Sequence, residues 1–466
     1  MTFASFKNAR IVRSSWLDEG GRRLDCNPYM SGALEARDAL SRLSVQTEKL
    51  ADLTDDIFHA GREGRLWVDD PEFGVPFLGS SDILCADLSH LPLIAKRQVA
   101  KNPKFKLGEQ WTLITRSGTI GRMTYVSKDT SGMACSEHVL RVVPKLDRIF
   151  PGYLYAYLAS RYGVPLVVSG TYGAIIQHIE PEHIAGLPVP RFGDDIEGSI
   201  HSLISEAAVL RDEAGRCLSQ AMSDFLAAAN LPVIESCGSV TPFSTSSVPA
   251  SSLQRRCDGF FHSRYHSDVV DAIRDCGLAT TSIGQIARGI QEPNRFKRIV
   301  LDADSGGVPL FGTSAIFWND PEPSYYLPRR LAAPYVVGRS TLLIPRSGQL
   351  QGVIGRPVLP YGDIIGGAVS EDAIRINCHS EIQAGFLFVF LSSEYGLRQL
   401  KARTFGTSIP HLDVRQISAC VIPELSPTLA ETIGKLGLRV SELRSDALNL
   451  EREARLAVER AIEEHA

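Results

Sequence analysis

A repeat that covers about half the chain is the feature that most restricts how this sequence can fold. Residues 74–83 (GVPFLGSSDI) return as residues 307–316 (GVPLFGTSAI), with six of ten residues identical at an offset of 233. Two longer segments, 152–163 and 170–190, return at the same offset. Self-similarity at a fixed period indicates a duplicated structural unit. The sequence therefore predicts two copies of one unit with variable interiors.

The first part of each copy, about 190 residues, has the composition of a mixed domain. Short apolar runs such as 111–115 and 342–345 alternate with Gly and Pro, which favours strands and turns. Segments 152–163 and 385–396 are apolar enough for buried helices, although periodicity alone does not separate such runs from strands.

The second part of each copy carries a heptad pattern. Apolar residues at alternating spacings of three and four run from Ile433 to Ala461, and the same pattern runs from Ile200 to Ala221. Such a pattern predicts a coiled-coil seam, on helices spanning roughly 193–229 and 425–465. The simplest pairing is of the two helices with each other. In the alternative, each apolar stripe packs only on its own globular part.

These patterns predict an α+β protein with two pseudo-repeated mixed α/β domains, separated by an antiparallel two-helix coiled coil. The Ser- and Pro-rich segment 231–252 is typical of a linker. The expected divisions are domain 1 (1–192), helix 1 (193–230), linker (231–252), domain 2 (253–423) and helix 2 (424–466).

The charge is unevenly distributed, although the whole chain carries only −4. Residues 88–128 hold eight basic side chains and one acid, and residues 323–362 hold five arginines and no acid. Helix 193–229 has seven acids and two bases. A basic surface on each copy is the electrostatic footprint of a polyanion-binding protein. The alternative is an ordinary solvated face with acids supplied from elsewhere in the fold.

Several classes of protein are disfavoured by the absence of their motifs. There is no G-x-x-x-x-G-K-[ST] loop, no G-x-G-x-x-G, no H-E-x-x-H and no Cys-x-x-Cys in the sequence. The Asn/Asp-Pro-Pro-Tyr/Phe tetrapeptide of amino-methyltransferases is also missing. Nine scattered cysteines, no apolar run of 18 residues and no secretory start lead us to expect a reduced cytoplasmic protein without a membrane span.

The order of the duplicated motifs resembles a known family. The residues concerned are 170–179 with the Leu-Pro-Val-Pro exit at 187–190, and 404–412 with the exit at 422–423. The Arg-x-Asp starts (Arg23/Asp25 and Arg256/Asp258) and the Arg-Ser-Gly turns at 116–118 and 346–348 belong to the same series. Together they resemble the specificity (S) subunit of type I restriction-modification systems. Neither exit has the Glu-Gln of many members, which leaves a related methylation-based phage-defence system open.

The resemblance implies a function without catalysis in this chain. Each domain would be a target-recognition domain that reads one half of a bipartite, asymmetric site in double-stranded DNA, and the helices would set the spacing. The chemistry would belong to two methyltransferase subunits that use S-adenosylmethionine, so no cofactor or metal is expected here. Whether a restriction or translocase subunit joins them stays open. An enzyme with an unrecognised active site and a protein-interaction scaffold are the other classes of function.

Candidate DNA-contacting residues combine basic side chains with polar side chains on expected loops. Cationic side chains contact phosphates, whereas amide, hydroxyl and arginine side chains contact base edges. In the first domain they are Lys101, Lys104, Arg116, Ser117, Tyr172 and Gln177. In the second domain they are Arg295, Lys297, Arg346, Gln349, Gln351, Thr407 and Ser408.

Overall fold

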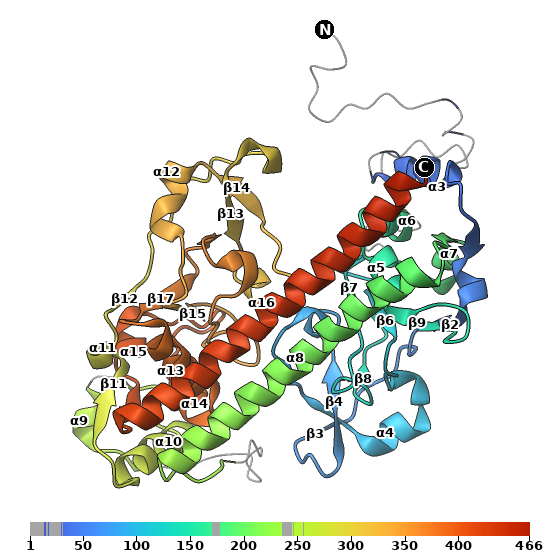
Figure 1. Cartoon of the computed structure of the whole chain (residues 1–466). Coiled ribbons are helices and arrows are strands. Elements are labelled where there is room, and N and C mark those ends of the chain that lie inside the picture. The colour runs from blue at the N-terminus through green and yellow to red at the C-terminus, as the bar shows by residue number, and fades with distance from the viewer. Residues whose placement is uncertain are drawn as a thin grey trace. The chain divides into compact units, whose positions relative to one another are not determined.

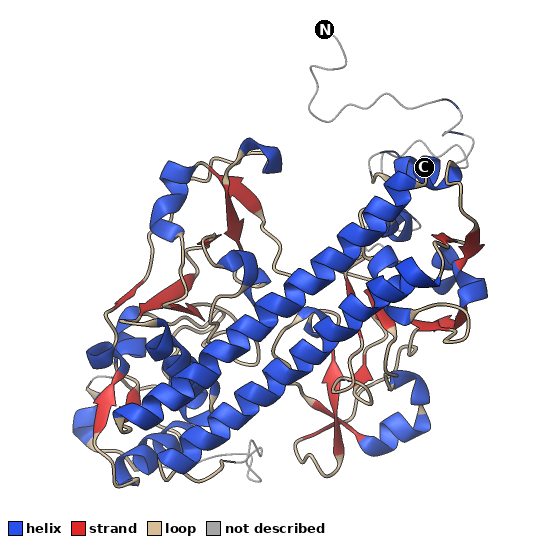
Figure 2. Cartoon of the chain, in the orientation of Figure 1, coloured by secondary structure: helices blue, strands red, loops and turns tan. Residues whose placement is uncertain are grey.

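The structure is a computed structural model, and it describes residues 31–169, 178–234, 247–254 and 256–466, together with Ser14, Leu17, Tyr29 and Thr245. The chain divides into two compact units. Unit 1 comprises residues 1–212 and 447–466, and unit 2 comprises residues 213–446. Both contain helices and short strands (Figures 1 and 2), so the chain is a mixed α+β protein.

Unit 1 is built on two four-stranded sheets with strand orders β2-β9-β6-β7 and β3-β5-β4-β8. A third, two-stranded sheet pairs β1 with β10. The strands are β1 (Thr47–Lys49), β2 (Thr54–Phe58), β3 (Trp67–Val68), β4 (Gly74–Leu78), β5 (Leu93–Ala95), β6 (Thr112–Thr115), β7 (Met123–Tyr125), β8 (Ala134–Cys135), β9 (Val139–Pro144) and β10 (Pro188–Pro190). The shorter helices are α3 (Ala33–Ser41), α4 (Lys96–Lys101), α5 (Pro151–Leu158), α6 (Gly163–Ser169) and α7 (Pro181–Ala185).

Unit 2 has two three-stranded sheets, β12-β17-β15 and β14-β13-β16, and the two-stranded pair β11-β18. The strands are β11 (Thr280–Ser282), β12 (Gly289–Gln291), β13 (Val308–Phe311), β14 (Tyr325–Leu327), β15 (Thr341–Pro345), β16 (Ala368–Val369), β17 (Ala373–Asn377) and β18 (Val421–Pro423). The shorter helices are α9 (Ala250–Leu253), α10 (Arg264–Asp275), α11 (Ile283–Ile286), α12 (Arg329–Ala332), α13 (Glu381–Ser392), α14 (Glu394–Ala402) and α15 (Val414–Ser418).

The pairing of these strands follows one register in both units. Strand β4 pairs with β8 in parallel, and β13 pairs with β16 in parallel. Leu113 of β6 faces Arg141 of β9, and Leu343 of β15 faces Arg375 of β17. Equivalent positions can therefore be assigned from backbone pairing as well as from sequence.

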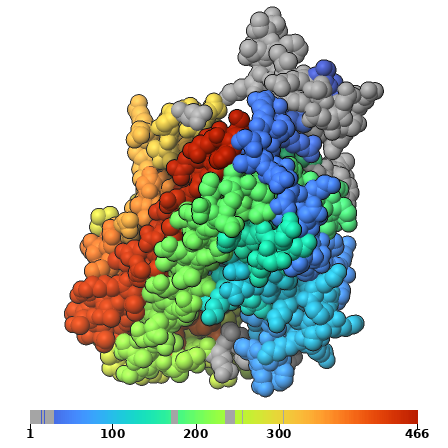
Figure 3. All heavy atoms as spheres, turned by 45° about the vertical axis from the view of Figure 1, so that its right-hand side comes forward, coloured from blue at the N-terminus to red at the C-terminus, as the bar shows by residue number. Residues whose placement is uncertain are grey.

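Two long helices, α8 (Asp194–Ala228) and α16 (Pro427–Glu464), occupy the two heptad segments. In unit 1 the Arg211 guanidinium lies 2.8 Å from the Glu451 carboxylate. In unit 2 the Cys217 thiol donates to the Leu436 carbonyl at 3.5 Å. In unit 2 the Arg439 guanidinium also lies 3.6 Å from the Glu213 carboxylate, so higher numbers on α8 accompany lower numbers on α16 and the two helices are antiparallel there. Near the C-terminus the surfaces of α8 (green) and α16 (red) adjoin in Figure 3.

The same helices also pack on the globular parts. In unit 1, Ile200 and Ile204 of α8 and Val458 and Ile462 of α16 belong to one buried cluster with Tyr153 of α5 and its neighbours. In unit 2, α13 and α16 approach closely at Gly385 and Gly434, where an added Cβ at Gly385 would lie 2.2 Å from the Gly434 carbonyl oxygen. The long helices therefore contact each other and also the globular parts, and the coiled-coil seam stays a prediction.

Candidate nucleic-acid interface

One end of the β2-β9-β6 sheet gathers polar side chains in unit 1. Strands β2 and β6 both run antiparallel to β9, with Phe58 facing Arg141 and Thr115 facing Val139. The residues that follow β2 and β6 therefore meet the residues that precede β9. This geometry brings together His59, Arg116, Ser117, Glu137 and His138, which we call the unit 1 rim.

An inaccessible arginine supports this rim. Arg141 is completely buried, and its guanidinium donates to the main-chain carbonyls of Cys135, Ser136 and Val139. Burial lowers the pKa of Arg141, because desolvation disfavours the charged form. The fork of donors holds the turn between β8 and β9 in one conformation, and that turn carries Glu137 and His138.

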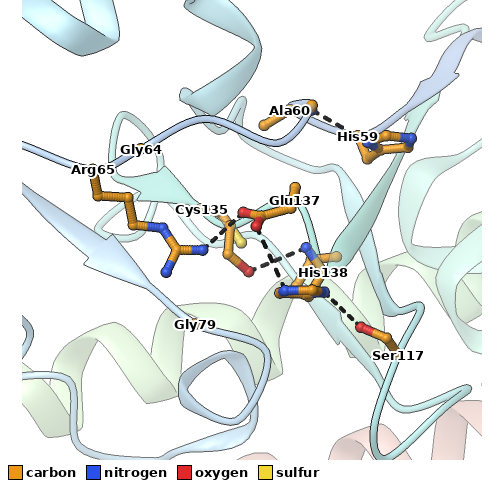
Figure 4. Close-up of polar contacts among 12 residues, drawn as sticks. His59, Ala60, Gly64, Arg65, Gly79, Ser117, Cys135, Glu137 and His138 are labelled. Atoms are coloured by element: carbon orange, nitrogen blue, oxygen red, sulfur yellow. Dashed lines mark hydrogen bonds and ion pairs between the residues drawn. The ribbon is translucent and has the colours of Figure 1, made fainter. Parts of the chain in front are cut away.

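Polar contacts link the members of the rim (Figure 4). The Arg65 guanidinium lies 2.8 Å from the Glu137 carboxylate, and the Ser117 hydroxyl lies 2.7 Å from Nδ1 of His138. Nε2 of His138 lies 3.5 Å from the Glu137 carboxylate. Burial acts to raise the pKa of Glu137, but its own backbone N–H and the Arg65 guanidinium outweigh this and lower it. Glu137 is therefore an ionised acceptor at neutral pH.

A second set of contacts lies beside the first. The Arg116 guanidinium is ion-paired with Glu180 and donates through Nε to the Ile179 carbonyl at 3.1 Å. Nε2 of His59 lies 3.5 Å from the other Glu180 oxygen. Burial and the nearby Arg116 charge lower the pKa of His59. The imidazole of His59 is therefore predominantly neutral near pH 7.

The other predicted residues of unit 1 differ in exposure. Lys101 on α4 and Lys104 in the turn after it are exposed. Lys101 borders a depression of about 610 Å³ that is also lined by Arg65, Arg97 and Gln98. Arg116 and Ser117 are buried, with 9% and 7% of their surfaces accessible. Tyr172 and Gln177 lie outside the described residues.

Unit 2 has an equivalent buried arginine, but the polar side chains around it differ from those of unit 1. Arg375 is 2% exposed and donates to the carbonyls of Val369, Ser370 and Ala373. Burial lowers its pKa to about 10. Arg298 lies 3.1 Å from Glu371, as Arg65 does from Glu137 in unit 1.

Acidic side chains surround the strand ends of unit 2. Arg346 is ion-paired with Glu292, and its Nε lies 3.8 Å from the Asp372 carboxylate. Glu292 follows β12 and Asp372 precedes β17, which are the places held by His59 and His138 in unit 1. We call Glu292, Arg346, Glu371 and Asp372 the unit 2 rim.

The remaining predicted residues of unit 2 are exposed and fall into two groups. Gln349 donates to the Ser408 carbonyl at 3.4 Å, and the Gly348 N–H donates to the Pro410 carbonyl at 3.3 Å. These bonds join the loop of Gln349 and Gln351 to the loop of Thr407 and Ser408. Arg295 and Lys297 lie on a separate exposed segment after β12, which is anchored by the stacking of Phe296 on Tyr335 at 4.0 Å.

Sequence reasoning did not select His59, Arg65, Glu137, His138, Glu292, Arg298, Glu371 or Asp372. One signal was available, because Arg65 and Arg298 are separated by 233 residues, the offset of the repeat. Glu137 and Glu371 are also equivalent, but they lie 234 residues apart, one residue off the offset of the repeat. His59 and His138 had no such signal, because Glu292 and Asp372 stand in their places in the second copy.

Two other kinds of feature are absent from the described residues. No helix in that part of the chain is long and apolar enough to cross a membrane. No group of three or more His, Cys, Asp or Glu side chains there is placed to hold a metal ion.

Comparison with known proteins gives structural similarities but no sequence match. No protein-family model and no curated protein matches the chain. The chain is similar to the type I restriction-modification system S subunit from M. genitalium, at 12% identity and a TM-score of 0.34, with 90% of this chain and 96% of that chain covered. It is also similar to the HsdS subunit from Thermoanaerobacter tengcongensis, at 13% identity and a TM-score of 0.28, with 90% and 97% covered.

A third similar chain comes from a structure that describes the structural basis of complex assembly and conformational transition of the type I R-M system. It has 12% identity and a TM-score of 0.27, with 90% of this chain and 97% of that chain covered. The system is the one whose S subunit the sequence motifs resemble.

Proposed function

We propose that this protein is a non-catalytic DNA-specificity subunit, which reads a bipartite, asymmetric DNA site and directs methyltransferase subunits to it. One observation carries the proposal. A buried arginine, Arg141 or Arg375, fixes the same strand-end turn in each unit, while the polar rim around that turn differs. Two readers that share a support and differ at the rim are suited to two different half-sites, because base contacts specify sequence.

The chain also supplies what a DNA reader needs for affinity. Basic side chains cluster in 88–128 and 323–362, and the exposed Lys101, Lys104, Arg329 and Arg330 belong to these stretches. Cations of this kind bind phosphates and release counterions, which makes affinity depend steeply on salt. A scaffold that binds an acidic protein would not need two rims that differ from each other.

In this proposal the domains have distinct roles. Residues 1–192 and 253–423 are pseudo-repeated target-recognition domains, and 231–252 is a linker. Helices 193–230 and 424–466 form an antiparallel coiled coil that acts as a spacer. A helix of 35 residues is about 50 Å long, which corresponds to about one and a half turns of B-DNA.

The methyl transfer itself belongs to partner subunits. Two methyltransferase subunits would bind S-adenosylmethionine and flip the target base out of the duplex. A restriction or translocase subunit would be an additional partner, and a related methylation-based defence system would use the same specificity role.

The proposal is tested by co-expressing the full chain with the methyltransferase encoded beside it and mapping methylated bases across the host genome. We expect methylation at one bipartite, asymmetric motif, and its loss when this chain is omitted. Stable co-purification without any motif-specific methylation or DNA binding would contradict the proposal and favour a scaffold. DNA cleavage or modification by the purified chain alone would favour an enzyme.

A further inference from the structure

The two units can be compared position by position, because strand pairing fixes their equivalence independently of sequence identity. Arg141 and Arg375 each face a leucine of the neighbouring strand, Leu113 or Leu343. Arg141 also faces Phe58 of β2, as Arg375 faces Gln291 of β12. His138 and Asp372 each lie three residues before the buried arginine, so they occupy one structural position.

Some exposed cations are shared by the two units. Arg97 is the second residue of α4, which follows strand β5, and Arg330 is the second residue of α12, which follows strand β14. Arg62 and Arg295 lie on the segments that follow β2 and β12. All four are exposed, and each pair is separated by 233 residues. The sequence around them has diverged, since α4 begins Lys-Arg-Gln-Val and α12 begins Arg-Arg-Leu-Ala.

The position of His138 and Asp372 is accessible to solvent but has diverged. Their side chains are 48% and 40% accessible. Each rests on the same support, which is a buried arginine below and an Arg–Glu ion pair beside it. The imidazole can donate a hydrogen bond, whereas an ionised carboxylate only accepts. The change therefore reverses the hydrogen-bonding character of one point on a shared scaffold.

Two readers on one kind of duplex face identical phosphates and different bases. Phosphate contacts carry no sequence information, so they can be shared, whereas base contacts must differ when half-sites differ. On the basis of the proposed function, we propose that Arg97 and Arg330 are equivalent phosphate contacts and that His138 and Asp372 are equivalent base-reading residues. Asp372 would accept from the amino group of cytosine, and His138 would donate to an acceptor such as guanine N7 or O6.

The test uses the full chain in complex with its methyltransferase and duplexes in which each half-site is randomised in turn. Bound sequences are read out, and affinity for one fixed duplex is measured over a range of salt concentrations. The variants are Asp372→Asn, His138→Gln, Arg97→Ala and Arg330→Ala. Arg264→Ala is the control, because Arg264 is exposed and its counterpart at the repeat offset is Ser31.

Asp372→Asn and His138→Gln should each change base preference at one position of one half-site by about tenfold or more, with the other half-site unchanged. Since amides read adenine, the shift should be toward adenine. Arg97→Ala and Arg330→Ala should weaken binding to all sequences and lower the slope of log K against log salt by about one, without changing the motif. Arg264→Ala should do neither.

The failure modes are distinguishable. Absence of any sequence preference in the wild-type complex overturns the proposed function. A wild-type bipartite motif that Asp372→Asn and His138→Gln leave intact overturns the assignment of these base-reading residues. Motif changes in Arg97→Ala or Arg330→Ala, or salt slopes equal to those of Arg264→Ala, overturn the assignment of the phosphate contacts.

Discussion

At the scale of single residues, the buried arginines show how charge can serve local structure. Arg141 and Arg375 are almost inaccessible, and each donates to three carbonyls of its own turn. A guanidinium suits this task because its planar fork offers five donors in fixed directions. Removing it leaves buried acceptors without donors, at about 1–3 kcal/mol each.

Arg141→Ala should therefore lower the stability of unit 1 by about 3 kcal/mol or more, and Arg375→Ala should do the same in unit 2. Hydrogen exchange of peptides covering 134–144 and 368–378 gives separate readings for the two units. We expect faster exchange only in the unit that carries the substitution. Arg460→Ala is the control, since Arg460 is exposed on α16 and such changes usually stay within about 0.5 kcal/mol. Equal protection in Arg141→Ala and the control would rule out the supporting role.

At the level of residues, the sequence indicated which turns carry polar side chains but not how deeply those side chains are buried. The Arg-Ser-Gly turns supply Arg116 and Ser117 to the unit 1 rim and Arg346 to the unit 2 rim, but Arg116 is ion-paired with Glu180 and only 11% of its side chain is accessible. A motif gives spacing and residue type, and burial depends on chain segments such as 179–180 that are distant in sequence. We therefore interpret Arg116 as a residue that orients the rim. Its proposed contact with DNA stays a prediction.

At the scale of elements, a backbone contact between α13 and α16 depends on glycines that let the two helices of unit 2 approach closely. Gly385 and Gly437 also meet there, since an added Cβ at Gly437 would lie 2.3 Å from the Gly385 carbonyl oxygen. Backbone atoms cannot move aside as a flexible side chain can, so a methyl group at this point forces the helices apart. In unit 1 the corresponding Gly152 faces His201 of α8.

Gly385→Ala should destabilise unit 2 by about 1–3 kcal/mol, the usual range for overpacking. Gly215→Ala is the matched control, because Gly215 is in the interior of α8 and has nothing within 4 Å of an added Cβ. That change should stabilise the helix by about 0.5–1 kcal/mol, since alanine has the higher helix propensity. Thermal unfolding should show a lower melting temperature for Gly385→Ala and a higher melting temperature for Gly215→Ala. A neutral or stabilising Gly385→Ala would show that the helices separate without cost.

The strongly periodic elements were the easiest to predict. Helices were expected at 193–229 and 425–465 and lie at Asp194–Ala228 and Pro427–Glu464. The expected helix at 152–163 is interrupted, because α5 ends at Leu158 and α6 begins at Gly163. The strand pairings were not predictable, because β3, β8 and β16 have only two residues each and their partners are fixed by tertiary contacts.

At the scale of the whole molecule, each long helix passes from one unit into the other, near residue 212 in α8 and residue 446 in α16. If the helices act as a spacer, adding length at these two points should change the distance between half-sites and nothing else. Insertion is preferable to deletion here, because it keeps every contact within each unit. Asp212, for example, keeps its hydrogen bond with Ser127 at 2.6 Å.

Inserting seven residues after Asp212 and seven after Asp446 lengthens each helix by about 10 Å, which corresponds to about three base pairs at 3.4 Å each. A heptad returns an α-helix to within about 20° of its starting direction, so the seam is preserved. Genome-wide methylation mapping should show both half-site motifs unchanged and a spacer about three base pairs longer. Insertion of seven residues into 231–252 should leave the spacer unchanged, because a linker does not hold the units apart. Retention of the original spacer by the helix variant, with methylation intact, would disprove the spacer role and leave the rims as independent readers.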